Sequence, residues 1–178
     1  MRIMKRTFSL AAAGGLTLLI AAVGPAAAPT SALKGHNSNA PVDVNADRME
    51  VQDRADRAMF VGNVHVKQDE LTLDTARLTI AYSSAGKIQI QRLDAAGGVV
   101  VRSPTETGRG NFGIYDLNRK LITLIGDVRL DRGGSSLMGQ RLVIDLNSGR
   151  AVVDGGPPGV NGAGGRVSGH FTVPQKNG

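Results

Sequence analysis

The sequence contains one short pattern twice, and this repeat constrains the fold more than any other feature. The pattern is FVGNVHV at residues 60–66 and LIGDVRL at residues 124–130. We assign one face to odd-numbered apolar residues before each glycine (Met59 and Val61 in the first copy) and to even-numbered ones after it. Strand side chains alternate with a period of two, so this change needs an extra residue. We therefore predict a β-bulge or corner at each Gly-Asn/Asp pair, because these residues tolerate positive φ.

Longer stretches share the same repeat. Arg77-Leu78-Thr79-Ile80 returns in similar form at residues 141–144, and related stretches begin at Arg48 and Asn111. Each unit has room for about two short strands with alternating polarity, and no long window keeps a helical period. The pattern indicates an all-β core, and stacked units of this size are typical of a jelly roll, a solenoid or a sandwich.

The start of the chain has the pattern of a cleavable secretory signal. A basic beginning (Arg2, Lys5 and Arg6) precedes an apolar run from residue 10 to about residue 23 and small residues at 26–28. We predict that residues 1–28 are removed on export, with cleavage as late as residue 32 as a second option. The alternative is an uncleaved membrane anchor, although the run is shorter than the roughly 20 residues of a spanning helix.

The rest of the chain divides by composition into three parts. The polar composition of residues 33–40 predicts a flexible segment, called here the lead-in, before the β core. Residues 41–154 form the predicted β core, and residues 155–178 form a Gly/Pro-rich tail with one last edge strand at 166–174.

Charge and cysteine content exclude several classes of protein. The net charge is +6, of which three positive charges lie within residues 1–28. The exported part is therefore only mildly basic, which is too little to indicate nucleic-acid binding. The chain has no cysteine, so neither a disulfide nor a thiolate metal site is available.

The sequence indicates no catalytic, metal or cofactor site, and we predict that the protein is not an enzyme. GRGNFG at residues 108–113 fits a nucleotide-binding pattern, but it continues as a strand and does not open a helix. The three histidines, His36, His65 and His170, are scattered. Aromatic residues are few, whereas an interior rich in aliphatic side chains suits methylene chains.

Three stretches carry a resemblance to a known family: PVDVNADRMEV at residues 41–51, the block at 59–80, and its echo at 121–144. Together they resemble the OstA-like family of lipopolysaccharide-transport proteins, over nearly the whole predicted core. The resemblance implies a twisted, open β-jelly roll of about sixteen short antiparallel strands that binds lipopolysaccharide inside. It also implies a periplasmic, head-to-tail homo-oligomer that bridges the inner and outer membranes and contributes to outer-membrane assembly.

The implied partners are lipopolysaccharide, an LptC-like inner-membrane component and an LptD-like outer-membrane translocon. Through the P-x-x-x-x-A-D motif of the family, the resemblance implies that Val42 and Val44 contact the lipid. The alternating apolar residues are our further candidates for the lining, as ligand contacts or as core: Met49, Val51, Val64, Val66, Leu71, Leu73, Leu78, Ile80, Ile88, Ile90, Val99, Val101, Phe112, Ile114, Val128, Leu130, Leu142 and Ile144.

The lipid phosphates would lie at the groove mouth, within reach of Arg48, Arg77, Arg92, Arg102 or Arg141. Three other interpretations stay open at this point. They are a membrane-anchored LptC-like component of the same pathway, a β-solenoid enzyme acting on polysaccharide, and a purely structural repeat protein.

Overall fold

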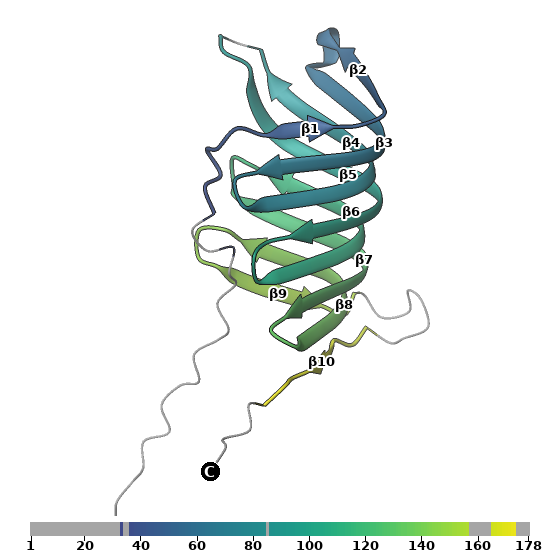
Figure 1. The fold of residues 1–178 in the computed structure, drawn as a ribbon, viewed down its shortest axis with the longest axis vertical. Coiled ribbons are helices and arrows are strands. Elements are labelled where there is room, and N and C mark those ends of the chain that lie inside the picture. The colour runs from purple at the N-terminus through teal and green to yellow at the C-terminus, as the bar shows by residue number, and fades with distance from the viewer. Residues whose placement is uncertain (1–32, 34–35, 85, 157–164, 174–178) are drawn as a thin grey trace, which may run out of the picture.

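The computed structural model describes residues 33, 36–84, 86–156 and 165–173 (Figure 1). The predicted signal at residues 1–28 lies outside these ranges. The described part contains one short 3-10 helix, Asp53–Ala55, and ten strands. The strands are β1 (Asp43–Asn45), β2 (Arg48–Gln52), β3 (Arg57–Gln68), β4 (Leu71–Ser83), β5 (Gln89–Arg102), β6 (Glu106–Asp116), β7 (Leu121–Arg132), β8 (Ser135–Asp145), β9 (Arg150–Asp154) and β10 (Ser168–His170).

All ten strands belong to one antiparallel sheet, so the predicted all-β class is confirmed. Strands β3 to β8 form a meander in which each strand pairs with the next. Both β1 and β2 pair with β3, and both β9 and β10 pair with β8. The predicted number of about sixteen short strands differs from the ten described, because the six strands of the meander continue through a bend instead of stopping at it.

A line of bends crosses the meander and folds the sheet in two. The strand register shifts at this line in the pairings from β3–β4 to β7–β8. At the line β3, β5 and β7 each carry two consecutive residues with positive φ: Gly62-Asn63, Gly97-Gly98 and Gly126-Asp127. The predicted bulges at the two Gly-Asn/Asp pairs are therefore confirmed, and Gly97-Gly98 is a third bend that we did not predict. Its signal was present, since Gly-Gly precedes Val99 and Val101 as Gly-Asn precedes Val64 and Val66.

The two halves of the bent sheet are called here the β1 arm, which carries β1 and β10, and the β2 arm, which carries β2 and β9. Figure 1 shows their strands crossing in two layers that join along one side of the molecule. The turns β3–β4, β5–β6 and β7–β8 end the β1 arm, and the turns β4–β5, β6–β7 and β8–β9 end the β2 arm. The arms therefore enclose a trough whose mouth lies between these two rows of turns.

An Asn–Asp pair supports each of the two predicted bends. The Asn63 Nδ2 donates a hydrogen bond to the Asp47 Oδ2 at 2.9 Å. In the second copy Asn and Asp exchange positions: the aspartate lies at the bend, and the Asn111 Nδ2 donates to the Asp127 Oδ2 at 3.1 Å. The bond joins residues sixteen positions apart in both copies, so the repeat preserves a hydrogen bond as well as a glycine.

The face assigned inward before each glycine was wrong. The buried residues are Phe60 and Leu124, whereas Met59 and Val61 are only partly buried and lie on the other face. A pair of left-handed residues preserves the alternation within its own strand, so even numbers stay inward on both sides. The change of parity occurs in the neighbouring strand, where Leu73 and Leu78 both face inward.

Candidate functional site

The inner faces of the two arms form an apolar trough that runs across the strands. In the β2 arm one row follows the pairing from Phe60 through Leu78, Ala95, Gly113 and Leu124 to Leu142 and Val153. In the β1 arm a matching row follows Val44, Val66, Leu73, Val101, Gly108, Leu130 and Leu137. The trough is the candidate functional site, because it is a continuous apolar surface shared by all six strands of the meander.

Most of the predicted lining residues lie on this inner face. Met49 and Val51 are there too, opposite Phe60 and Ala58, but on edge strand β2 they remain about half exposed. The other members on this face are Val42, Val44, Val64, Val66, Leu71, Leu73, Leu78, Ile80, Ile90, Val99, Val101, Val128, Leu130, Leu142 and Ile144. Their contact with a lipid stays a prediction.

The side chains of three predicted lining residues do not point into the trough. Phe112 is 55% exposed and pairs with Ala96 and Ile125 on the outer face. The register places the Ile114 side chain on that same outer face, two residues further along β6, although Ile114 still borders the small central cavity. Ile88 precedes β5 and is 73% exposed. The error in β6 has a clear cause, since the bend shifts its alternation and three of its inward positions are glycines.

The glycines of β6 explain the nucleotide-like pattern at residues 108–113. Gly108, Gly110 and Gly113 face the trough, and neighbouring side chains lie over them. A Cβ at Gly108 would lie 2.9 Å from the Leu124 Cδ1, and one at Gly113 would lie 3.0 Å from the Val99 Cγ1. The glycines therefore provide room for large residues of β5 and β7.

The centre of the trough is filled by its own side chains. Leu78, Leu124 and Leu142 are fully buried, and the cavity between the arms there measures about 20 Å³, roughly the room needed by one water molecule. We expected a groove open along its length, and the structure differs. An empty apolar groove would leave a large area exposed to water, so the arms close on each other.

A buried amide joins the two arms at the mouth of the trough. Gln68, from the β1 arm, is 3% exposed, and its Oε1 accepts a hydrogen bond of 3.0 Å from the hydroxyl of Tyr115 in the β2 arm. Its Nε2 donates to the backbone oxygens of Ser38 and Ala40, both at 3.0 Å. The His36 Nε2 lies 3.1 Å from the same Oε1.

This arrangement holds residues 36–40, within the predicted lead-in, beside the turns that border the mouth (Figure 1). Burial raises the pKa of the Tyr115 hydroxyl above its usual value, and this hydroxyl is protonated at neutral pH with or without that shift. The sequence analysis did not identify Gln68 or Tyr115 as important. A glutamine between inward-facing valine and leucine was the available signal.

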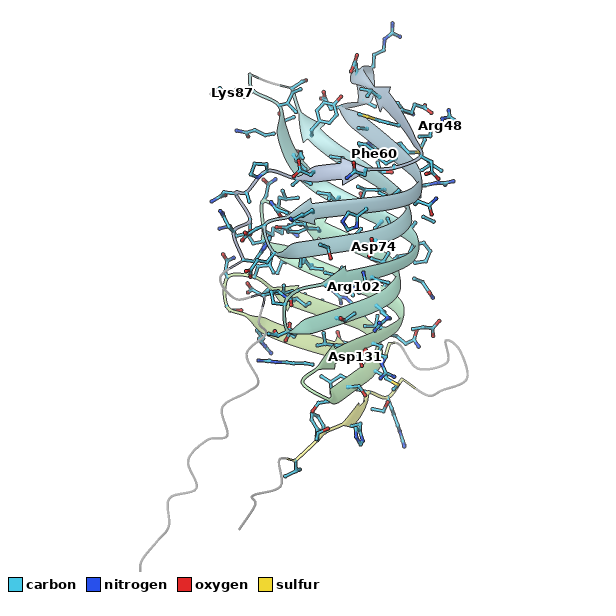
Figure 2. All side chains as sticks on the ribbon, in the orientation of Figure 1. Arg48, Phe60, Asp74, Lys87, Arg102 and Asp131 are labelled. Atoms are coloured by element: carbon cyan, nitrogen blue, oxygen red, sulfur yellow. The ribbon has the colours of Figure 1, made fainter. Side chains whose placement is uncertain are left out.

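Charged residues line the outside of the β1 arm, where Figure 2 labels Asp74, Arg102 and Asp131. The His65 Nδ1 lies 2.7 Å from the Asp74 Oδ1, and Arg102 pairs with the other oxygen of that carboxylate. These two partners, His65 first, hold the pKa of Asp74 below its usual value.

The arginines predicted to meet lipid phosphates at the groove mouth lie on the outer face of the sheet, and their contact with a phosphate stays a prediction. Arg48 pairs with Glu50 at 3.3 Å and Arg92 with Asp94 at 2.7 Å. The register of β4 and β8 places Arg77 and Arg141 on the outer face of the β2 arm.

Within the described ranges, no three His, Cys, Asp or Glu residues are grouped so that they could hold a metal ion. In that same part of the chain, no helix is long and apolar enough to cross a membrane.

The structural class of this chain is a bent antiparallel sheet that encloses an apolar trough. Comparisons with known proteins identify the family to which it belongs. Residues 43–150 match the family model described as LptA/(LptD N-terminal domain) LPS transport protein. The chain therefore belongs to the LptA/LptD N-terminal-domain family of lipopolysaccharide-transport proteins.

A relative and a solved structure agree with this assignment. The protein R00383 of Rhizobium meliloti (strain 1021), described as uncharacterized, is 30% identical over 155 residues, which cover 82% of this chain and 83% of that protein. The fold is similar to the crystal structure of LptH, the LptA-homologous periplasmic component of the lipopolysaccharide transport device from Pseudomonas aeruginosa. That match has a TM-score of 0.68 at 17% identity and covers 78% of this chain and 99% of LptH.

Proposed function

We propose that the chain binds lipopolysaccharide through its acyl chains in the trough and carries it across the periplasm, from the inner to the outer membrane. The observation that carries the proposal is the mainly apolar inner face of both arms, in a chain of a lipopolysaccharide-transport family. Each methylene exposed to water costs about 0.8 kcal/mol. A chain of about twelve carbons therefore costs on the order of 10 kcal/mol, which an apolar trough offsets without any chemical step.

Loading requires the two arms to part, because the centre of the trough is filled. Apolar contacts between the arms can be exchanged for contacts with acyl chains at little net cost, since both are dispersion and burial of similar surface. The polar bond between Gln68 and Tyr115 must break for the arms to separate at the mouth. The three bends with paired positive φ lie where a hinge between the arms would act.

The ends of the sheet support a head-to-tail bridge. β1 and β2 are the edges at one end, and β9 and β10 are the edges at the other. Edge strands offer unpaired N–H and C=O groups to another chain. In this proposal copies of the chain stack through these edges and connect an LptC-like inner-membrane component to an LptD-like outer-membrane translocon, and residues 1–28 direct export to the periplasm.

A photo-crosslinking experiment tests lipid binding. A photoreactive residue at Ile80 or Leu73, both on the inner face, is expected to form an adduct with lipopolysaccharide in cells. The matched controls are Thr79 and Thr72, the preceding residues on the opposite face. No adduct at either inner position, or equal adducts at inner and outer positions, would contradict the proposal.

A further inference from the structure

A short segment before β1 lies along the mouth of the trough. It belongs to the predicted lead-in, and its described residues, Leu33 and residues 36–40, are called here the strap. In Figure 1 the chain before β1 runs down the side of the molecule where the two rows of turns lie. The strap therefore lies where an acyl chain would have to enter between the arms.

The buried amide of Gln68 holds the strap, mainly by its backbone. The Nε2 donates to the carbonyl oxygens of Ser38 and Ala40, both at 3.0 Å. The Oε1 accepts from the Tyr115 hydroxyl at 3.0 Å and lies 3.1 Å from the His36 Nε2. A glutamine side chain has two donor hydrogens and two acceptor positions, so all four are used here. Three of the four contacts go to the strap, and one goes to the β2 arm.

The strap also has hydrogen bonds of its own. The His36 N–H donates to the Leu33 oxygen at 3.1 Å, and the Ser38 N–H donates to the His36 oxygen at 3.0 Å. The Ala40 N–H donates to the Asn37 oxygen at 3.0 Å. These short-range bonds keep the segment compact and fix the positions of the two carbonyls that accept from the buried amide.

One apolar side chain of the strap is buried in the interior. Leu33 is 5% exposed and belongs to the hydrophobic core cluster, whereas the other described residues of the strap are partly buried or exposed. It is the only large apolar residue between positions 33 and 40. Burial of a leucine favours the docked strap by roughly tenfold or more, and water can replace the hydrogen bonds to Gln68 at a small net cost. The docked state therefore depends mainly on one apolar contact, which another apolar group can replace.

We propose that the strap closes the mouth of the trough in the lipid-free protein and that an incoming acyl chain displaces Leu33. The strap can leave without unfolding a strand, because β1 begins only at Asp43. Its release leaves Gln68 with one bond to the β2 arm, so the arms then separate more easily. The inference rests on the proposed function for the ligand, an acylated lipid, and it adds a lid that the same chain supplies.

A single cysteine can report on the strap, because the chain contains none. In the purified protein without residues 1–28, Leu33→Cys is expected to react with the thiol reagent dithionitrobenzoate at least about tenfold more slowly than Asn39→Cys, its exposed control in the same strap. In the Leu33→Cys background, Gln68→Leu should raise the rate about fivefold or more, the factor for one net hydrogen bond. Tyr115→Phe leaves the bonds between Gln68 and the strap in place, so it should leave the rate nearly unchanged. Equal acceleration by both changes would show that the junction of the arms, and not the strap, buries position 33.

Addition of lipid tests the displacement. Lipopolysaccharide is expected to raise the rate of Leu33→Cys nearly to that of Asn39→Cys, because an acyl chain takes the place of the buried side chain. Deacylated lipopolysaccharide keeps the sugars and phosphates but lacks the tails, so it should have no effect. Because a cysteine fills less space than a leucine, hydrogen exchange of the unsubstituted protein is the second measurement. The amides of residues 36, 38 and 40 should be protected in the free protein and lose this protection with lipopolysaccharide.

The outcomes separate this inference from the proposed function. If Leu33→Cys reacts as fast as Asn39→Cys and the three amides exchange freely, the strap does not close the mouth, while transport through the trough stands. If Ile80 crosslinks to lipopolysaccharide but the Leu33→Cys rate and the amide protection do not respond to it, lipid enters without displacing the strap and the inference is wrong. If neither Ile80 nor Leu73 gives an adduct, the proposed function itself fails, and displacement by lipid fails with it.

Discussion

The bend line gives a prediction with three matched variants, Gly98→Ala, Gly126→Ala and Gly62→Ala. All three glycines have φ between +80° and +83°. An L-residue in this left-handed region costs about 1–2 kcal/mol, so each variant should lose at least that much free energy of unfolding. The surroundings differ, because a Cβ at Gly98 meets nothing within 4 Å.

The second bend adds a steric cost to this backbone cost. A Cβ at Gly126 would lie 2.8 Å from the Asn111 Nδ2, the atom that donates to Asp127. Displacing that amide breaks a hydrogen bond worth about 1 kcal/mol, which brings the expected loss for Gly126→Ala to about 2–3 kcal/mol. Gly62→Ala should behave alike, because its Cβ would meet the carboxylate of Asp47.

Urea denaturation of the purified mature proteins, followed by far-ultraviolet circular dichroism, measures these differences. The expected order of stability is wild type, then Gly98→Ala, then Gly126→Ala together with Gly62→Ala. If Gly98→Ala were as stable as wild type, the backbone argument would be wrong. If Gly126→Ala were no less stable than Gly98→Ala, the Asn–Asp pair would have no role at the bend.

Three further changes test the core, the rim and the outer face. Leu78→Ala removes a fully buried side chain from the trough and should lower the free energy of unfolding by about 2–5 kcal/mol, measured by urea denaturation. Tyr115→Phe removes the bond between the arms, so it should cost about 1 kcal/mol and speed the uptake of lipopolysaccharide in a stopped-flow assay; slower uptake would contradict this role. Because the pKa of Asp74 is lowered in the folded state, mainly by the hydrogen bond from His65, its contribution to stability is present above about pH 4 and lost as the pH falls through the lowered pKa. In Asp74→Asn, the melting temperature should therefore fall less steeply below pH 4 than it does in the wild type. An equally steep fall in both proteins would exclude this contribution.

Much of the fold follows from the sequence, because the repeated Gly-Asn/Asp pairs require a bend and the alternation requires strands. The number of strands does not follow, since a bend with positive φ can either end a strand or let it continue. Hydrogen bonding across neighbouring strands decides this, and the sequence of one strand does not contain that information. The same limit explains why Phe60, and not Met59, faces the trough.

The candidate site was predictable where large aliphatic residues occupy inward positions, as at Val64 and Leu142. It was not predictable in β6, because there three of the inward positions are glycines and the apolar Phe112 lies outside. A pattern of hydrophobic residues identifies the inward face of a strand only when the inward positions carry apolar side chains, and glycines carry none. Gln68 was missed for the opposite reason, since a polar residue at an inward position is recognisable as a junction only when its partners are known.

The line of bends also determines how this architecture can vary in size. Every added hairpin of the same strand length lengthens the trough by two strand spacings, about 10 Å, along the line of bends. The β2 arm, from β2 to β9, spans seven such spacings or roughly 34 Å. Duplication of one hairpin unit would therefore yield a longer trough, and the length of such a protein follows from its number of strands.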